Sequence, residues 1–372
     1  MEYTWRRYDL KYTFINCTFD LKVQFINING GCMKKYICLF LCIIILFTGC
    51  TTKKASDFES SVSDSAAQNN PFDIDTKNDS TVIASYGFKA NSIDENNHVI
   101  QYNGGELEVD FSLMNSQIPC EAGIMLYVNG VAQPYSTEEY SNKKLIQPYQ
   151  LGKNETKIVK AKFIPAVGKK GETLDIYCTA MLNPSFVPSE NVKNILPNHS
   201  IIQTLPWNIQ CNQDSANSEL NICTKYNISD ITQETKDKYI QKDKDGNITG
   251  NSLDQSLNVD LTDGTSSLNN LNLSSGDKKI TLQCLGGKEY KYRISFYINH
   301  KLVPVFDGKD YLDITMTKDK MITKDIILNA KNLSLNDYNS MYVVAVPLNP
   351  PMSFDAPGVE KTSSVILIKG ST

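Results

Sequence analysis

Residues that commonly do chemistry are sparse in this 372-residue chain, and their spacing matches no ligand set. The histidines, His98, His199 and His300, lie far apart in the sequence. The cysteines that follow residue 50 contain no CxxC pair; they are Cys120, Cys178, Cys211, Cys223 and Cys284. Because a zinc site needs clustered cysteine and histidine ligands, we expect neither a metal nor a cofactor.

The cysteines allow two interpretations. Cys211 and Cys223 flank a short polar stretch and could pair in a disulfide, or both could stay free. Cys178 and Cys284 lie within strand-like runs, which is typical of buried small hydrophobic residues rather than reactive thiols.

One polar stretch resembles a calcium-binding loop. Residues 238–250 (KYIQKDKDGNITG) place Asp243, Asp245 and Gly246 as in the middle of an EF-hand. The twelfth position would be Ser252, so the bidentate acid is missing. A hairpin turn at Asp245-Gly246 explains the same residues, and we favour the turn.

No motif of an enzyme is present. The chain has no Gly-x-Ser-x-Gly nucleophile elbow, and Gly286-Gly287-Lys288 lacks the rest of a phosphate loop. Carboxylates from distant strands can still converge, so a glycosidase-like site stays an alternative. We predict that the protein is not an enzyme.

The most informative stretch is residues 33–50, MKKYICLFLCIIILFTGC. Lys34 and Lys35 precede a short apolar run that ends in Thr48, Gly49 and Cys50, the order of a secretory signal. This segment resembles the lipobox signal peptide of bacterial membrane lipoproteins, although Phe47 stands where leucine is commonest. The resemblance implies cleavage before Cys50, lipid on its thiol, palmitate among the acyl chains, and a place on the extracytoplasmic face of the cell membrane. An uncleaved transmembrane anchor is the alternative, but the run is shorter than the ~20 residues that span a bilayer.

Charge limits the partners of the exported part. Six Lys+Arg and three Asp+Glu precede Cys50, which leaves 31 basic and 38 acidic residues, a net charge of −7. An acidic chain without a basic cluster argues against nucleic acid and against electrostatic binding to anionic lipid. Lipid on Cys50 would therefore supply the membrane attachment.

Two segments flank the signal. Residues 1–32 do not fit an export signal, which sits at the extreme N-terminus, and we interpret them as a mis-called extension before a true start at Met33. Residues 50–80 are polar, rich in Ser, Asp and Asn, and too poor in large apolar residues to offset their ordering entropy. We expect them to form a lipidated, disordered tether.

From residue 81 onward, short runs of alternating apolar residues are separated by turn residues. Residues 106–114 (ELEVDFSLM), 123–129 (GIMLYVN) and 173–181 (TLDIYCTAM) are examples, and no stretch combines a helical period with caps. This pattern predicts an all-β protein of two tandem immunoglobulin-like β-sandwich domains. We place them at 81–211 and 225–370, with a linker at 212–224.

The second domain is predicted to duplicate the first. Residues 293–299 match 123–129 at an offset of 170, 321–330 match 157–166 at 164, and the strand before Leu348-Asn349-Pro350 matches the one before Leu182-Asn183-Pro184 at 166. Two unrelated β segments of similar composition are the alternative.

Two proline-rich loops and one tyrosine-rich loop are candidate contact sites. Residues 182–188 and 348–357 follow the best strand of each half and carry Phe186 and Phe354. Each phenylalanine either forms a rigid contact surface or plugs its own sandwich, and we favour the plug. Tyr135, Tyr140 and Tyr149 could form a glycan-binding platform, but we favour ordinary solvent-facing tyrosines.

These observations predict a membrane-anchored extracytoplasmic lipoprotein with a non-catalytic binding or interaction role at the cell surface, whose partner is a surface protein or a glycan. An envelope structural or assembly lipoprotein and a solute- or glycan-binding lipoprotein are the alternatives. The ligand and the oligomeric state are left open by the sequence.

Overall fold

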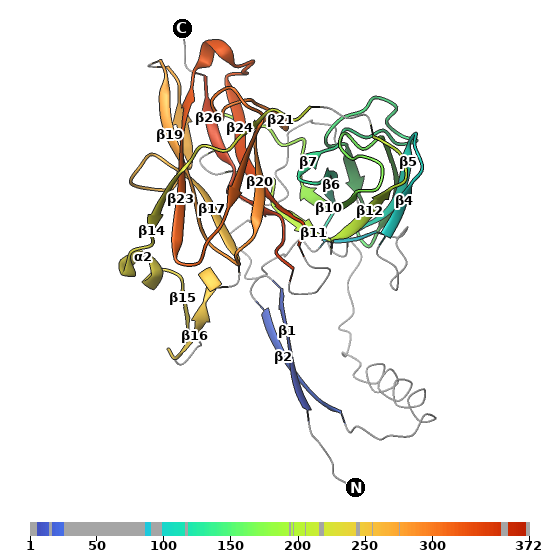
Figure 1. The fold of residues 1–372 in the computed structure, drawn as a ribbon, viewed down its shortest axis with the longest axis horizontal. Helices are drawn as coiled ribbons and strands as arrows, with labels where there is room; N and C mark the ends of the chain where they lie inside the picture. Colours follow the sequence, from blue (N-terminus) through green and yellow to red (C-terminus); the bar gives the residue numbers. More distant parts are fainter. Residues whose placement is uncertain are drawn as a thin grey trace, which may run out of the picture. The chain divides into compact units, whose positions relative to one another are not determined.

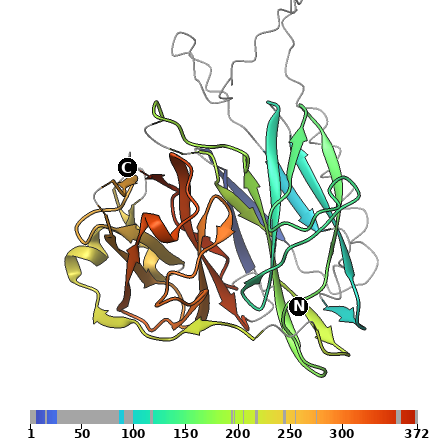
Figure 2. The same cartoon turned by 90° about the horizontal axis from the view of Figure 1, so that it is seen from above.

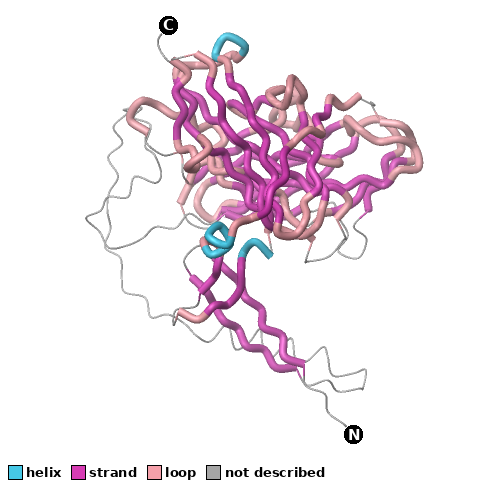
Figure 3. Tube along the Cα trace, turned by 60° about the vertical axis from the view of Figure 1, so that its left-hand side comes forward, coloured by secondary structure: helices cyan, strands magenta, loops and turns pink. Residues whose placement is uncertain are grey.

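The computed structural model describes residues 6–14, 17–25, 86–90, 99–115, 118–192, 195, 197–204, 206–215, 219–242, 246–254, 256–274, 276–350 and 356–369. Strands make up most of this part of the chain, and its few helical segments are short (Figure 3). The signal segment, Cys50, the tether at 50–80, Phe354 and the acids Asp243 and Asp245 lie outside the described residues.

The chain divides into two compact units, Met1–Gln68 and Asn69–Thr372. In the first unit, β1 (Arg6–Phe14) pairs with β2 (Cys17–Phe25) as an antiparallel hairpin. No helix among the described residues is both long enough and apolar enough to cross a membrane.

The second unit begins with a sandwich of two sheets, drawn in cyan to green (Figure 1). One sheet has the order β4-β12-β10-β6-β7, with β8 on β6 and β11 on β10; the other has the order β3-β5-β9. The strands are β3 (Tyr86–Ala90), β4 (Val99–Tyr102), β5 (Leu107–Asn115), β6 (Cys120–Val128), β7 (Val131–Ala132), β8 (Pro148–Leu151), β9 (Thr156–Phe163), β10 (Thr173–Leu182), β11 (Ile201–Gln203) and β12 (Trp207–Cys211).

A second sandwich follows, drawn in yellow to red (Figures 1 and 2). Its larger sheet has the order β13-β22-β20-β24-β26-β18, with β21 on β20 and β25 on β24, and its smaller sheet has the order β14-β23-β19-β17. The strands are β13 (Ile222–Cys223), β14 (Asn227–Asp230), β17 (Leu257–Thr262), β18 (Asn270–Asn272), β19 (Lys278–Gly286), β20 (Lys291–Ile298), β21 (Lys301–Leu302), β22 (Tyr311–Thr315), β23 (Lys320–Leu328), β24 (Tyr338–Leu348), β25 (Glu360–Lys361) and β26 (Val365–Ile368).

A small excursion between β14 and β17 holds all but one of the remaining elements. Helix α2 (Gln233–Asp237) is capped by Thr232, whose side chain accepts a hydrogen bond from the Thr235 backbone N–H. The hairpin of β15 (Ile240–Lys242) and β16 (Ile248–Asn251) precedes the short helix η1 (Ser252–Asp254), and a second short helix, η2 (Ala330–Asn332), follows β23.

Alternation along the strands builds a core within each sandwich. In β5, Val109, Phe111 and Leu113 are fully buried and face the first core, as their period of two requires. In β19, Ile280, Leu282 and Cys284 do the same in the second core. The all-β, sandwich-like fold expected from the sequence is therefore present.

The pairing scheme of the first sandwich recurs in the second. Every strand from β3 to β12 has a counterpart from β17 to β26 with the same partner, including the parallel pairs β4–β12 and β18–β26. Residue correspondences follow from the ladders: Tyr127 pairs with Tyr177 as Tyr297 pairs with Tyr342. That the two halves arose by duplication stays a prediction.

The ladders correct two of the sequence offsets. Phe163 pairs with Leu107 in the first sandwich, and Leu328 pairs with Lys278 at the same ladder position in the second. Phe163 therefore corresponds to Leu328, and the offset between β9 and β23 is 165 rather than 164. Tyr177 and Tyr342 set the β10–β24 offset at 165 rather than 166. A slip of one residue would exchange the two faces of a strand. The match between the Leu-Asn-Pro segments gives an offset that is one too large, because these segments follow the strands and β24, with 11 residues, is one residue longer than β10, with 10.

The two sandwiches pack against each other through their larger sheets. Strands β6 and β10 present Met125, Tyr127, Tyr177 and Met181, and β20 and β24 present Tyr297, Tyr342, Val344 and Val346, all in one buried cluster. These strands are thus buried on both faces, which explains their nearly continuous apolar sequences. The segment at 212–224, expected as a linker, contributes Leu220 and Ile222 to the edge of the first core.

Candidate binding groove in the second sandwich

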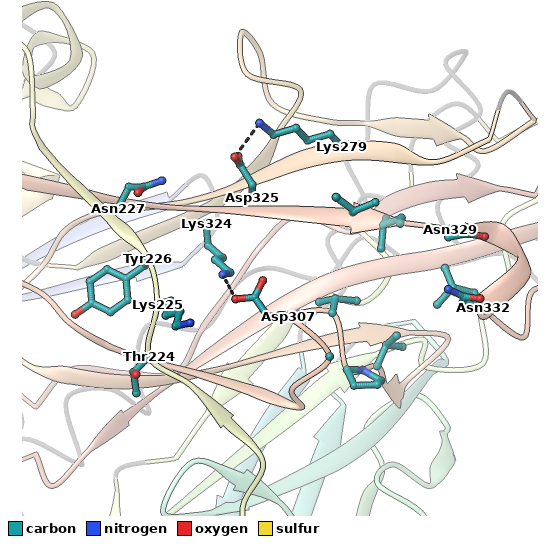
Figure 4. Close-up of a pocket in the computed structure, with 17 residues that line it drawn as sticks. Thr224, Lys225, Tyr226, Asn227, Lys279, Asp307, Lys324, Asp325, Asn329 and Asn332 are labelled. Carbon is teal, nitrogen blue, oxygen red and sulfur yellow. Dashed lines mark hydrogen bonds and ion pairs between the residues drawn. The ribbon is translucent and has the colours of Figure 1, made fainter.

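A groove of about 980 Å³ opens beside β23 in the second sandwich (Figure 4). Its walls combine the second part of β23 with the connection from β21 to β22 and the residues that lead into β14. Half-buried apolar side chains line it: Tyr226, Val303, Val305 and Leu333. This volume is at the upper end of the range for small-ligand sites, so the groove is large enough for a side chain or a short peptide segment.

A buried lysine forms part of the groove wall. Lys324 occupies an inward-facing position of β23, with 10% of its side chain exposed, and its Nζ lies 2.7 Å from Oδ2 of Asp307. The hydrogen bond from Lys324 lowers the pKa of the Asp307 carboxyl. Figure 4 shows this pair at the groove, with Lys279 and Asp325 forming a second pair, 2.8 Å apart, on the outer face. Both pairs are neutral overall.

One edge of β23 is open beside the groove. On that side β14 pairs with β23 only from Lys320 to Thr323, and among the described residues no strand continues the pairing along residues 324–328. The Ile327 side chain, 65% exposed, lies on this stretch. An open edge of this kind presents backbone N–H and C=O groups that can pair with another chain.

The same edge is covered in the first sandwich. By the β9–β23 correspondence, Lys162 is the counterpart of Ile327. Lys162 exchanges two backbone hydrogen bonds with Ser136, of 3.0 Å from Ser136 N–H and 2.8 Å from Lys162 N–H. Ser136 belongs to the connection from β7 to β8, so this loop takes the place of an additional strand.

Aromatic residues of that loop and of β8 fill the space behind it. Tyr135 and Tyr149 are buried, and the Tyr135 hydroxyl donates to the Ile124 carbonyl at 3.0 Å. Tyr140 is half-buried, with its ring centroid 5.5 Å from that of Tyr149. The interpretation as surface residues is therefore wrong for Tyr135 and Tyr149, and Tyr140 is only partly exposed.

The contact between the sandwiches holds a second polar cluster. His199 is fully buried, and its ring centroid lies 4.9 Å from that of His300. His300 makes hydrogen bonds of 2.7 Å to the Tyr342 hydroxyl and to the Pro184 carbonyl of the first sandwich. Burial lowers the pKa of His300 to about 4, and burial together with His300 lowers that of His199 well below its ordinary value. Both imidazoles are therefore neutral near pH 7.

A cavity of about 370 Å³ lies next to this cluster, between β11 and β25. The Lys361 ammonium sits 4.5 Å above the centre of the Tyr342 ring and donates to the Thr362 carbonyl and the Ser364 hydroxyl, each at 2.9 Å. Burial lowers the pKa of Lys361 to about 7 and raises that of Glu360 to about 7. Lys361, Thr362 and Ser364 thus have protein partners that account for their positions.

The Leu-Asn-Pro segments also meet the opposite sandwich. Pro184 supplies the carbonyl that binds His300, and the Asn349 backbone N–H donates to the Asp175 carboxylate. Phe186 is half-buried, with its ring centroid 6.0 Å from that of His199. Phe186 thus lies beside the contact between the sandwiches, and Phe354 is outside the described residues.

The remaining candidates of the sequence are not brought together. Cys120, Cys178, Cys211, Cys223 and Cys284 are free and buried, so Cys211 and Cys223 do not pair. Within the described part of the chain, no three His, Cys, Asp or Glu side chains form a metal-binding group.

Gly286 and Gly287 are explained by packing. Both have positive φ angles, 74° and 79°, and a Cβ at Gly286 would lie 2.7 Å from Leu253 Cδ2. Glycine is needed there for the close approach of the chain.

Sequence reasoning missed the groove and the Lys324–Asp307 pair. The only local signal was Lys324 itself, a charged residue at an inward-facing position of an alternating strand. A lysine in such a position invites a search for a carboxylate partner, but Asp307 lies in a loop whose path the sequence does not reveal.

Comparison with known proteins adds no family. No family model and no curated protein matches the chain. Solved structures with a likeness include the fibronectin(III)-like modules of CbhA from Clostridium thermocellum, at 9% identity and a TM-score of 0.18 over 76% of this chain and 93% of that chain. They also include the Salmonella enterica SafA pilin in complex with the SafB chaperone, at 10% identity and a TM-score of 0.23 over 78% of this chain and 98% of that chain. A third is CBD12 from CALX1.2, at 11% identity and a TM-score of 0.18 over 73% of this chain and 95% of that chain. The fold assignment rests on the sheets described above.

Proposed function

We propose that the protein is a membrane-anchored extracytoplasmic lipoprotein whose packed sandwiches serve a non-catalytic binding role. The groove beside β23 carries the binding part of this proposal. It joins apolar walls, a buried ion pair and an open strand edge in one place, a combination suited to recognising a partner.

The anchoring part is supported by the sequence of residues 33–50 alone. Lipid on Cys50 would bring two acyl chains or more, which gives stable attachment where one chain is marginal. The polar segment at 50–80 would then separate the membrane from the folded sandwiches by roughly 30 Å, at ~5–6 Å × √n for a flexible chain of n residues.

A Cys50→Ala variant tests the anchor in the native host. We expect the variant to lose metabolic palmitate labelling, because Cys50 is the lipid acceptor. We also expect the processed, membrane-bound form of the protein to disappear, because Cys50 is the residue at the cleavage point. Cys42→Ala is the matched control, since Cys42 lies within the same apolar run and should be removed with the signal. Palmitate labelling that persists in Cys50→Ala would refute the proposal.

A structural role in the envelope is the second candidate. It is favoured by the contact between the sandwiches, which is buried, apolar and crossed by hydrogen bonds such as that from Arg293 Nη1 to the Asn129 carbonyl at 2.8 Å. Such a contact makes the two sandwiches a stiff spacer. The open edge of β23 has no use in a pure spacer, so we rank the binding role first.

A further inference from the structure

The two sandwiches differ in one connection. The residue offset between them is 170 at the β7–β21 pairings and 165 at the β8–β22 pairings, as Ala132 corresponds to Leu302 and Pro148 to Asp313. The connection in the second sandwich is therefore five residues shorter, the difference between these offsets. The groove lies beside this shortened connection.

The shorter connection turns away from the edge that the longer one covers. In the first sandwich Ser136 runs alongside β9 and bonds to Lys162. In the second, Phe306 and Lys309 close a tight turn on themselves, with Asp307 at φ 54° and Gly308 at φ 76°. Among the described residues, nothing pairs with Ile327 as Ser136 pairs with Lys162.

The first sandwich also shows what kind of chain fits such an edge. Its loop contributes one extended residue, Ser136, with aromatic Tyr135 before it and Tyr140 shortly after it. Phe306 is buried in the second core and can serve as the counterpart of Tyr135. Tyr140 falls in the part of the loop that the second sandwich lacks, and the groove beside the shortened connection is lined by apolar Val303, Val305 and Leu333.

We propose that the open edge of β23 accepts an extended peptide segment of another protein as an added strand, with an aromatic side chain of that segment in the groove beside Val303, Val305 and Leu333. The inference rests on the proposed binding role and names its partner class. Backbone hydrogen bonds to Ile327 would supply the strand pairing, and the groove would select the side chain.

Local charge favours a segment with an acidic residue. The two ion pairs of the groove are internally neutral, and Lys225 is a further cation in the same groove: its charge helps to lower the pKa of Asp307, but it forms no ion pair with any described residue. In the first sandwich the loop that covers the edge carries Glu138 and Glu139, and Glu139 lies 2.8 Å from Lys157. A carboxylate that follows the paired residue would have Lys225 as a partner.

The chain's own loop provides the probe. A fluorescein-labelled peptide with the sequence of residues 133–144, QPYSTEEYSNKK, is titrated against the purified full-length protein, and fluorescence anisotropy reports binding. We expect saturable binding and slower hydrogen exchange of the Ile327 amide when the peptide is bound.

Two modified peptides test the pairing without altering the protein. N-methylation of the serine that corresponds to Ser136 removes the N–H that would donate to the Ile327 carbonyl, and we expect about tenfold weaker binding. N-methylation of the next residue, whose N–H faces away from the edge, is the matched control and should weaken binding by less than about threefold.

Three results would overturn the inference: no saturable binding at about 1 mM peptide, the approximate limit of weak specific association; equal effects of the two N-methyl groups; or unchanged exchange at Ile327. If the protein self-associates with rising concentration and this protects the Ile327 amide from exchange, the partner at the edge of β23 is a second copy of this chain and the proposed peptide partner is wrong. The Cys50→Ala experiment is independent, so failure of the anchor and failure of the edge can be told apart.

Discussion

At the scale of single residues, buried titratable groups are concentrated where the sandwiches meet. His199 and His300 lie ring to ring, and Lys361 lies over Tyr342. His300 also has an unusual backbone: it occupies the second position of a turn with φ 62°, where the first sandwich has Gly130 with φ 73°. A histidine held in this conformation joins the sandwiches through its bond to the Pro184 carbonyl.

This cluster predicts a loss of stability in acid. His300 has a pKa of about 4 in the folded chain and an ordinary value near 6.5, so the unfolded chain binds the proton first. The free energy of unfolding should therefore fall as the pH drops from about 6.5 to 4, by up to about 1.4 kcal/mol per pH unit for each histidine. Chemical denaturation across this pH range measures it.

His300→Asn separates this histidine from other groups, because asparagine tolerates the same backbone conformation. The variant should lose less stability between pH 6.5 and 4 than the wild type does. Glu360 changes the free energy of unfolding in the opposite direction. Its pKa is raised to about 7 in the folded chain, so the stability that its protonated form provides is lost as the pH rises from about 4.5 to 7. An unchanged pH dependence in His300→Asn would contradict the assignment.

At the scale of elements, the strands could be predicted from the sequence because their apolar residues either alternate, as in β5, or run continuously between turn residues, as in β10. The predicted 106–114 is observed as β5, Leu107–Asn115, and the predicted 173–181 as β10, Thr173–Leu182. What could not be predicted is how the edges close. The β7–β8 and β21–β22 connections are irregular, and only their three-dimensional paths reveal that one covers a strand edge and the other does not.

The candidate site could not be predicted from the sequence for the same reason: it depends on the three-dimensional paths of the loops. The sequence favours Phe186 as a plug of its own sandwich, with a rigid contact surface as the alternative, whereas its ring lies against His199 beside the contact between the sandwiches. Tyr135 and Tyr149 were placed at the surface, yet both are buried. A tyrosine-rich loop looks the same in sequence whether its rings face solvent or fill a sandwich end.

The Lys324–Asp307 pair predicts an asymmetry between two substitutions. Asp307→Asn leaves the Lys324 ammonium, 10% exposed, without a counterion, and should lower the free energy of unfolding by about 1–3 kcal/mol. Lys324→Met leaves the Asp307 side chain, 57% exposed, in contact with water. This substitution should change the free energy of unfolding by no more than about 1 kcal/mol. Urea unfolding measures both.

Lys279→Met is the control for that comparison, because its partner Asp325 and Lys279 itself are both exposed. We expect an effect below about 0.5 kcal/mol. Equal losses in Asp307→Asn and Lys324→Met would show that the lysine is not held in a desolvated position.

At the scale of the whole molecule, one strand plan is used twice for different purposes. The larger sheets face each other and are buried on both sides, so each of their central strands sends alternate residues to its own core and to the contact between the sandwiches. The smaller sheets lie on the far side of each core. One of them is closed at its β9 edge by Ser136, and the other is open at β23.

Residue-resolved hydrogen exchange of the free, full-length protein tests this difference most directly, because each sandwich serves as the control for the other. The Lys162 amide donates to the Ser136 carbonyl at 2.8 Å and should be protected. The Ile327 amide, its counterpart on the open edge, should exchange at least about tenfold faster. Equal protection of the two amides would contradict the account, because it would mean that the edge of β23 is already covered.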